Sequence, residues 1–216
     1  MEDLESIVVD PAQDSEAWQL LLDRASSLKP DNPLIEQLLI YGDKNDQAKC
    51  QQLFEAVLYD KCHLNYLEHL NLFGVNLKID QTRMTSMANL KYVDLNDIQT
   101  TDMPGFLRDL LSHCPAMTDL SLVVSDVYTN RVGTQDMVLH DYFRAVGPLH
   151  KVSELRLRFN VFEGAESLVK AFPKVETIEF YVPSSESVSD MGMGKTEYVN
   201  YLKQHLPPEV TIKVHE

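Results

Sequence analysis

The sequence predicts an α/β repeat fold, in which short parallel strands form a curved sheet on one face and helices cover the opposite face. A spacing of two residues and then one residue between apolar positions recurs about seven times along the chain, at irregular intervals. Segments with apolar residues at helical spacing separate many of these groups. The 216 residues are 44% hydrophobic, which is enough to bury a substantial core.

Each copy of this spacing predicts one short strand. The second and third apolar residues of a copy are two apart, so both side chains point inward and their neighbours point outward. The first residues of successive copies are 23 to 35 positions apart. The copies are Ile35, Leu38 and Ile40; Leu67, Leu70 and Leu72; Leu90, Val93 and Leu95; Met117, Leu120 and Leu122; Val152, Leu155 and Leu157; Val175, Ile178 and Phe180; and a degenerate last copy in which Pro207 stands before Val210, Ile212 and Val214.

Helices are expected between the strands, where apolar residues recur at three and four positions. Pro104 suits the first turn of one of them. The segment 82–88 is too short for a helix to be predicted there. The predicted helices span residues 51–64, 103–113, 137–146, 164–171 and 196–205.

The N-terminal part is expected to differ from the repeats. Residues 15–28 predict one amphipathic helix, whose stripe of Trp18, Leu21, Leu22 and Ala25 is expected to close the open end of the first repeat. The predicted organisation is an acidic segment with a capping helix over residues 1–30, followed by a repeat domain over residues 31–216.

Several repeat junctions resemble those of a known family. Residues 111–122, Leu-Ser-His-Cys-Pro-Ala-Met-Thr-Asp-Leu-Ser-Leu, resemble the helix-to-strand junction of ribonuclease-inhibitor-like and cysteine-containing leucine-rich repeats, as found in F-box leucine-rich-repeat proteins. Residues 87–95 and 172–180 are similar without the cysteine. The resemblance covers residues 34–214 and implies a recognition or adaptor module that binds a protein on the concave sheet face. No F-box is predicted, because residues 15–28 supply one helix where an F-box has three.

Composition disfavours several classes of ligand and location. A net charge of −14 would repel nucleic acid, so none is expected to bind directly. The first 60 residues hold 13 acidic and 4 basic side chains, which either keeps the protein soluble or attracts a basic partner. No apolar run approaches the roughly 20 residues of a membrane span. The start lacks a secretion signal, and the odd cysteines at positions 50, 62 and 114 suit a reducing compartment, so a cytoplasmic or nuclear location is expected.

No enzyme signature is found. Residues 192–196, Gly-Met-Gly-Lys-Thr, lack the preceding glycine of a phosphate-binding loop. The seven histidines are dispersed, without a nucleophile or metal-site motif. The sequence therefore predicts a non-catalytic module with no cofactor and no metal. The alternative prediction is a structural subunit docked permanently in a larger intracellular complex, with the terminal strand at residues 210–214 as the candidate docking edge.

The outward strand positions supply the candidate partner-binding residues. Exposed aromatic side chains near Arg are typical binding anchors, although scattered surface aromatics are also common. Arg156 and Arg158 either bind an acidic partner through forked hydrogen bonds or form ion pairs with Glu154 and Glu179. Residues 125–135 and 183–195 are predicted loops that could add contacts. The candidates are Tyr41, His69, Phe73, Tyr92, Arg156, Arg158 and Tyr181.

Overall fold

The structure is a computed structural model of the whole chain, and it confirms the α/β class with parallel strands. The chain divides into two compact units, residues 1–117 and residues 118–216. The described residues are 6–9, 19, 22–23, 36–42, 47–59, 67–100, 102–123, 148–158, 168, 170–181, 200, 203–204 and 206–215.

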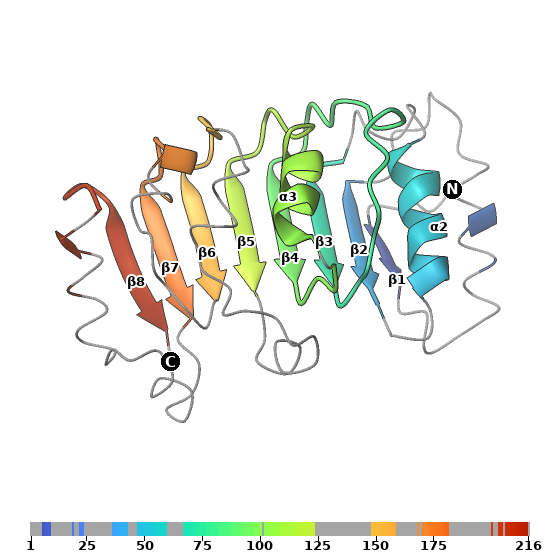
Figure 1. The fold of residues 1–216 in the computed structure, drawn as a ribbon, viewed down its shortest axis with the longest axis horizontal. Coiled ribbons are helices and arrows are strands. Elements are labelled where there is room, and N and C mark those ends of the chain that lie inside the picture. The colour runs from blue at the N-terminus through green and yellow to red at the C-terminus, as the bar shows by residue number, and fades with distance from the viewer. Residues whose placement is uncertain are drawn as a thin grey trace. The chain divides into compact units, whose positions relative to one another are not determined.

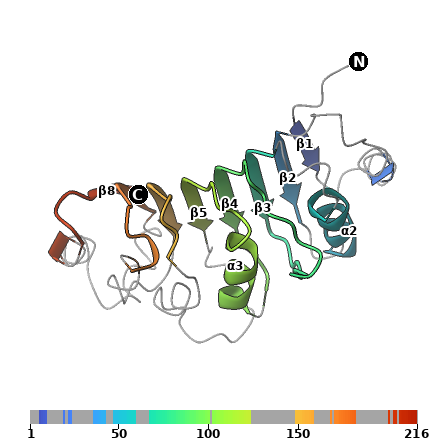
Figure 2. The same cartoon turned by 90° about the horizontal axis from the view of Figure 1, so that it is seen from above.

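The first unit contains four described strands that run parallel and are hydrogen-bonded in chain order (Figure 1). They are β1 (Ser6–Val9), β2 (Gln37–Tyr41), β3 (His69–Phe73) and β4 (Tyr92–Asn96). Helices α2 (Gln47–Leu58) and α3 (Met103–Leu111) lie on the same side of these strands (Figure 2). None of the described helices of this unit lies on the other side.

The core of the first unit lies between the strands and these helices. Leu38, Leu70 and Val93 are partners in register, and each is at most 2% exposed. Ile40, Leu72 and Leu95 form a second buried row beside them. Each such side chain contributes roughly 1.5–3 kcal/mol when fully buried. The inward faces of both helices complete the core through Cys50, Leu53, Phe54, Val57 and Leu58 of α2 and Met103, Phe106, Leu107, Leu110 and Leu111 of α3.

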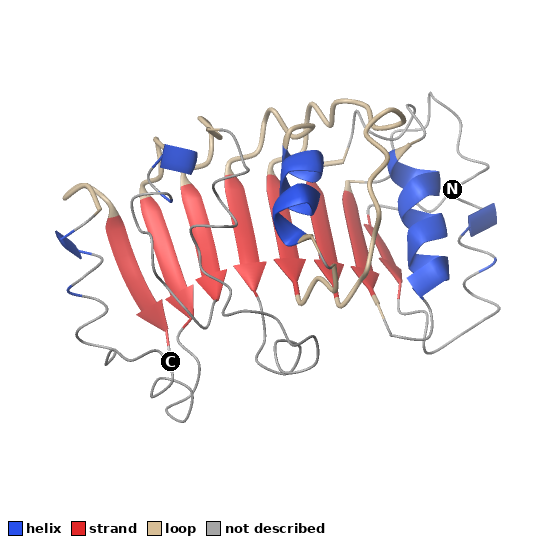
Figure 3. Cartoon of the chain, viewed as in Figure 1, coloured by secondary structure: helices blue, strands red, loops and turns tan. Residues whose placement is uncertain are grey.

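The second unit also contains four described parallel strands in chain order (Figure 3). They are β5 (Asp119–Val123), β6 (Glu154–Arg158), β7 (Thr177–Tyr181) and β8 (Thr211–His215). Leu120, Leu155 and Ile178 form one buried row, and Leu122, Leu157 and Phe180 form the next. The inward residues are therefore those that the apolar spacing predicts.

The same turn precedes five of the described strands. In four of them the first apolar residue of the repeat donates its backbone N–H to the carbonyl three residues earlier, and before the last strand Val210 makes the same bond, so these repeats share the turn. A carbonyl just before one strand then accepts N–H groups from the next repeat, as Glu68 O does from Lys91 and Tyr92. The donors in the turns are Leu90, Met117, Val152, Val175 and Val210.

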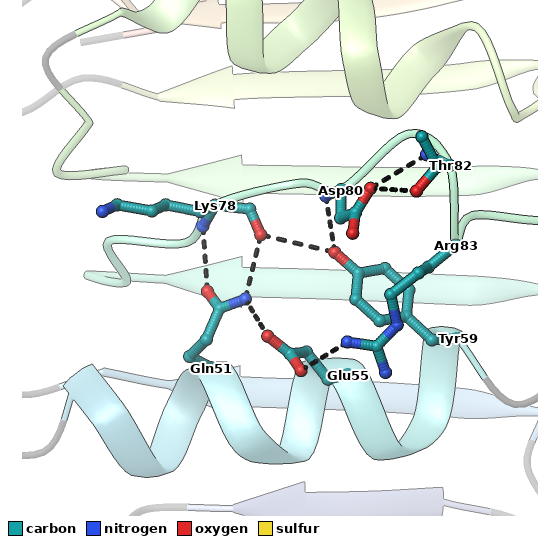
Figure 4. A network of polar contacts seen from close by, with 7 residues as sticks. All are labelled: Gln51, Glu55, Tyr59, Lys78, Asp80, Thr82 and Arg83. Atoms are coloured by element: carbon teal, nitrogen blue, oxygen red, sulfur yellow. Dashed lines mark hydrogen bonds and ion pairs between the residues drawn. The ribbon is translucent and has the colours of Figure 1, made fainter.

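The segment between β3 and β4 has no helix and is held by side chains of α2 instead (Figure 4). Gln51 donates to Lys78 O and accepts from Lys78 N, both at 2.9 Å. Tyr59 Oη accepts from Asp80 N at 2.7 Å. Gln47 makes the equivalent pair of bonds to Gly74 O and Asn76 N. These residues recur at helical spacing, so α2 supplies the bonds that the extended backbone lacks.

A second layer of contacts fastens the same segment. Arg83 forms an ion pair with Glu55 at 3.0 Å, and its guanidinium lies 4.3 Å from the centroid of the Tyr59 ring. Asp80 accepts two hydrogen bonds from Thr82, which hold the pKa of its carboxyl below the usual value. Burial raises the pKa of Tyr59, so it stays a neutral hydroxyl in this contact.

Helix α3 begins where the sequence predicts and is capped at that end. Asp102 accepts a hydrogen bond from Gly105 N at 2.9 Å, and Pro104 occupies the first turn, where no N–H partner is needed. Such a cap stabilises a helix by about 1 kcal/mol. Helix α2, in contrast, begins and ends several residues before the predicted 51–64.

Other predicted elements are seen only in part. Gln19, Leu22 and Asp23 are helical within the expected 15–28 segment, and Gln19 donates to Asp23. Leu168, Lys170 and Ala171 are helical within 164–171, and Asn200, Lys203 and Gln204 within 196–205. Residues 137–146 and the predicted loops 125–135 and 183–195 lie outside the described residues, as does the capping role of Trp18. Strand β1 was not predicted.

Candidate protein-binding surface

The outward side chains of β2, β3 and β4 form one surface in the first unit, which we call the aromatic face. Because the three strands pair in register, their outward residues line up in three rows across the strands. The rows are Gln37, His69 and Tyr92; Leu39, Asn71 and Asp94; and Tyr41, Phe73 and Asn96.

Two aromatic pairs border this face. The rings of Tyr41 and Phe73 are tilted with centroids 5.9 Å apart, and the rings of His69 and Tyr92 are stacked at 4.2 Å. Pairs of this kind add roughly 0.5–1.5 kcal/mol beyond the area that they bury. Tyr41, Phe73 and Tyr92 nevertheless remain 37%, 38% and 40% exposed. They are the large hydrophobic side chains that are exposed in the described part of the chain, and all three lie on this one face.

Asn71 and Asp94 of the middle row lie between the two aromatic pairs, and together we call them the polar row. Asn71 Nδ2 donates to Asp94 Oδ2 at 3.2 Å, and Asn96 Nδ2 donates to Asp94 Oδ1 at 2.7 Å. Each carboxylate oxygen therefore has one amide partner, and the carboxylate is held in one orientation. No described Lys or Arg forms an ion pair with Asp94.

The strands of the aromatic face end in close backbone turns. A Cβ atom on Gly42 would lie 2.6 Å from the carbonyl oxygen of Gly74, so a side chain does not fit there. Gly74 has a φ of 63°, and Asp97, at the matching place after β4, has a φ of 51°. Glycine adopts this left-handed conformation without strain, and Asp tolerates it better than most residues. These turns fix the backbone positions of Tyr41, Phe73 and Asn96, the last residues of the three strands.

The outward residues of the second unit form an ionic cluster around Glu179, which we call the Glu179 cluster. Lys213 Nζ lies 2.8 Å from Glu179 Oε1, and Arg156 Nε lies 3.5 Å from Glu179 Oε2. Arg156 also pairs with Glu154 at 3.0 Å. The hydrogen bond from Lys213 lowers the pKa of Glu179, and the same bond raises the pKa of Lys213. The cluster is therefore largely neutralised from within.

The candidate residues of the second unit thus differ from those of the first. The sequence left two possibilities for Arg156, an acidic partner or ion pairs within the chain. In the structure Arg156 pairs with Glu154 and Glu179. Tyr181 stacks on His215 with centroids 4.7 Å apart and donates to Glu179 at 3.4 Å. The side chain of Arg158 lies outside the described residues, although its backbone completes β6. Asp119 and Ser121, expected on the outward side, are buried at 9% and 8% exposure.

Sequence reasoning missed two contributors. Asp94 was one outward residue among many, and only the register shows that two amides converge on it. His215 was missed because the last apolar copy ends at Val214, whereas strand β8 extends to His215. His215 Nε2 lies 3.6 Å from Glu179 Oε2, just beyond hydrogen-bond reach, and this atom has no hydrogen-bond partner.

The described residues also bear on other kinds of site. Cys50 and Cys114 are thiols buried in the core, and burial raises the pKa of Cys114 to about 12. Its Sγ donates to Leu110 O at 3.4 Å, which is a structural contact. Within the described segments, no three His, Cys, Asp or Glu side chains gather as a metal site would need. No helix there is long and apolar enough to cross a membrane.

Comparisons of the chain with protein-family models, with curated proteins and with solved structures found no significant match. No function is therefore transferred from another protein.

Proposed function

We propose that this chain is a non-catalytic recognition module that binds a protein partner through the aromatic face. The observation that carries the proposal is the gathering of Tyr41, Phe73 and Tyr92 on one side of β2, β3 and β4. Aromatic side chains are enriched in protein interfaces, because a rigid ring buries a large area at a low entropic cost. The polar row between the rings supplies groups that can fix the orientation of a partner.

The fold proposed with this function is a leucine-rich-repeat solenoid of about seven irregular repeats. The recurring turn before the strands supports it, because one backbone conformation returns at the same place in successive repeats. The in-register apolar rows support it as well. A partner on the strand side is then the natural mode of binding, since helices occupy the other side of the first unit (Figure 2).

The test compares three versions of the full chain by affinity purification from cells that make the protein, with quantitative mass spectrometry. The first is the wild type, and the second carries Tyr41→Ala, Phe73→Ala and Tyr92→Ala. The third is a matched control with Gln52→Ala and Arg108→Ala, two exposed residues on the helix side of the same unit. We expect the triple variant to recover at least tenfold less of a reproducible partner than the wild type does. The reason is that the loss of each interface anchor typically costs about 1–2 kcal/mol of binding free energy.

Circular dichroism and thermal unfolding check that each variant is folded. Equal recovery of every partner by the wild type and a folded triple variant would contradict the proposal. Loss of the same partner by the control pair alone would place binding on the helix side instead.

A permanent structural subunit is the second candidate. Strand β8 is the last strand of the second unit, and its inward Ile212 and Val214 are only half-buried, whereas Ile178 and Phe180 of β7 are fully buried. An edge strand with a partly exposed apolar side can pair with another chain. A subunit of this kind would be recovered in fixed stoichiometry with its neighbours and would aggregate when expressed alone, whereas a recognition module would remain a stable monomer.

A further inference from the structure

The carboxylate of Asp94 is the unusual group on the aromatic face. None of the nine outward residues of β2, β3 and β4 is Lys or Arg, and Asp94 is their one carboxylate. Its described partners are the neutral amides of Asn71 and Asn96. In the second unit, Glu179 stands in an outward row of the same kind but is paired with Lys213 and Arg156. The negative charge of Asp94 is therefore held in one orientation, and no cation among the described residues compensates it.

We propose that the aromatic face binds an arginine of the partner, with its guanidinium on Asp94 and its flat faces against the neighbouring rings. This inference rests on the proposed function and names the chemistry of the partner. It commits to a polypeptide segment with an arginine at its centre, not to an apolar segment or an acidic one.

The hydrogen bonds of Asp94 leave room for such a ligand. A carboxylate has roughly four acceptor sites, two on each oxygen. Asn71 occupies one site on Oδ2 and Asn96 one site on Oδ1, so one site remains on each oxygen. Two parallel N–H groups of one guanidinium match that pair of sites. The amides already hold the carboxylate in place, so little side-chain entropy is lost on binding.

The rings flank Asp94 at the right spacing. Outward residues on one strand are about 7 Å apart, because the rise is roughly 3.3 Å per residue. Tyr92 is one such step before Asp94 on β4, and Phe73 is diagonal to Asp94 on β3, beside Asn96. A planar guanidinium on Asp94 therefore has aromatic surface on two sides, where it gains a cation–π attraction. A lysine ammonium cannot make the forked pair of hydrogen bonds or stack.

The charge of the unit favours the same partner. Residues 1–117 contain 19 acidic and 9 basic side chains, a net charge of −10, whereas residues 118–216 have a net charge of −4. A field of this sign attracts a basic segment and repels an acidic one. Charge complementarity thus agrees with the geometry at Asp94.

The test uses selection from a library of random 12-residue peptides displayed on phage, with the immobilised full chain as target. The targets are the wild type, Asp94→Asn, Asp94→Lys, the pair Tyr41→Ala and Phe73→Ala, and a control, Glu209→Gln, which removes one exposed carboxylate from the second unit. Asp94→Asn removes the charge and keeps the shape. Thermal unfolding verifies each target.

We expect the wild type and Glu209→Gln to enrich the same peptides, with one arginine at a fixed position. These peptides should bind Asp94→Asn at least tenfold more weakly, as the loss of charge-assisted hydrogen bonds requires. Asp94→Lys should instead select Asp or Glu at that position. Selected peptides that lack an arginine, or that bind Asp94→Asn equally well, overturn the inference while the proposed function stands. Peptides that bind the Tyr41→Ala and Phe73→Ala variant as tightly as the wild type count against the proposed function itself. A selection that enriches no peptide also counts against it.

Discussion

Two carboxylates in equivalent outward positions have opposite surroundings. Glu179 is in contact with cationic side chains, whereas the partners of Asp94 in the described part of the chain are amide donors. The sequence predicts that both are outward, because they lie between inward apolar residues. It does not predict their partners, since these depend on which residues of neighbouring strands are in register. The sequence thus predicts which side chains of a strand point outward, but it does not predict which of them pair across neighbouring strands.

The buried cysteines are expected to be chemically inert. Thiol alkylation requires the thiolate, and a pKa of about 12 leaves almost none at Cys114 near neutral pH. In native protein treated with iodoacetamide at pH 8, peptide mapping should find Cys50 and Cys114 unmodified, and both should react after unfolding in urea. Rapid labelling of Cys114 in the native protein would show that the repeat opens at this junction.

The ion pair of Glu179 and Lys213 predicts a window of pH dependence. The folded state lowers the pKa of Glu179 from 4.5, so the stabilisation is present above about pH 4.5 and is lost as the pH falls further. The folded state raises the pKa of Lys213 from 10.5, so the stabilisation is present below about pH 10.5 and is lost as the pH rises further. The wild type should therefore melt at a higher temperature than Lys213→Met between these limits.

Thermal unfolding at pH 3, 7 and 11 measures this difference. The melting temperatures of the wild type and Lys213→Met should differ most at pH 7 and converge at both extremes. Because Lys213 is exposed, added salt should shrink the difference at pH 7. A difference that is constant over the whole range would exclude the ion pair as its cause.

At the scale of elements, strands were easier to predict than helices. Seven strands follow the apolar spacing, because one shift of register would expose every inward residue of a strand. Helix α2 begins before the predicted start, and its first residue, Gln47, bonds to the next segment. Strand β1 was missed because the Ser6–Val9 run is short and lacks the spacing of the other repeats.

The side-chain bonds of α2 give a prediction of their own. Gln51→Ala should lower the free energy of unfolding by about 1 kcal/mol, because two hydrogen bonds to Lys78 are lost but water can replace them. Gln52→Ala is the matched control, since Gln52 is its exposed neighbour on the same helix. Urea unfolding measures both. Equal stability of the two variants would mean that the Gln51 bonds to Lys78 do not stabilise the segment between β3 and β4.

At the scale of the molecule, composition and repeats predicted the fold class, but they did not separate the aromatic face from the other outward strand residues. The aromatic candidates were spread over both units, and among the described residues the exposed large rings lie in the first unit. In the second unit, Arg156 and Tyr181 are occupied by Glu179. A sequence shows which side chains point outward, whereas their exposure and pairing depend on the packed neighbours.

Site-specific photo-crosslinking tests the central claim most directly. A photoreactive benzoylphenylalanine is placed at position 73, on the aromatic face, or at position 52, on the helix side of the same unit. After irradiation in cells that make the protein, position 73 should crosslink to a protein partner through a segment that contains arginine, and position 52 should not. A partner captured from position 52 and never from position 73 would contradict recognition through the aromatic face.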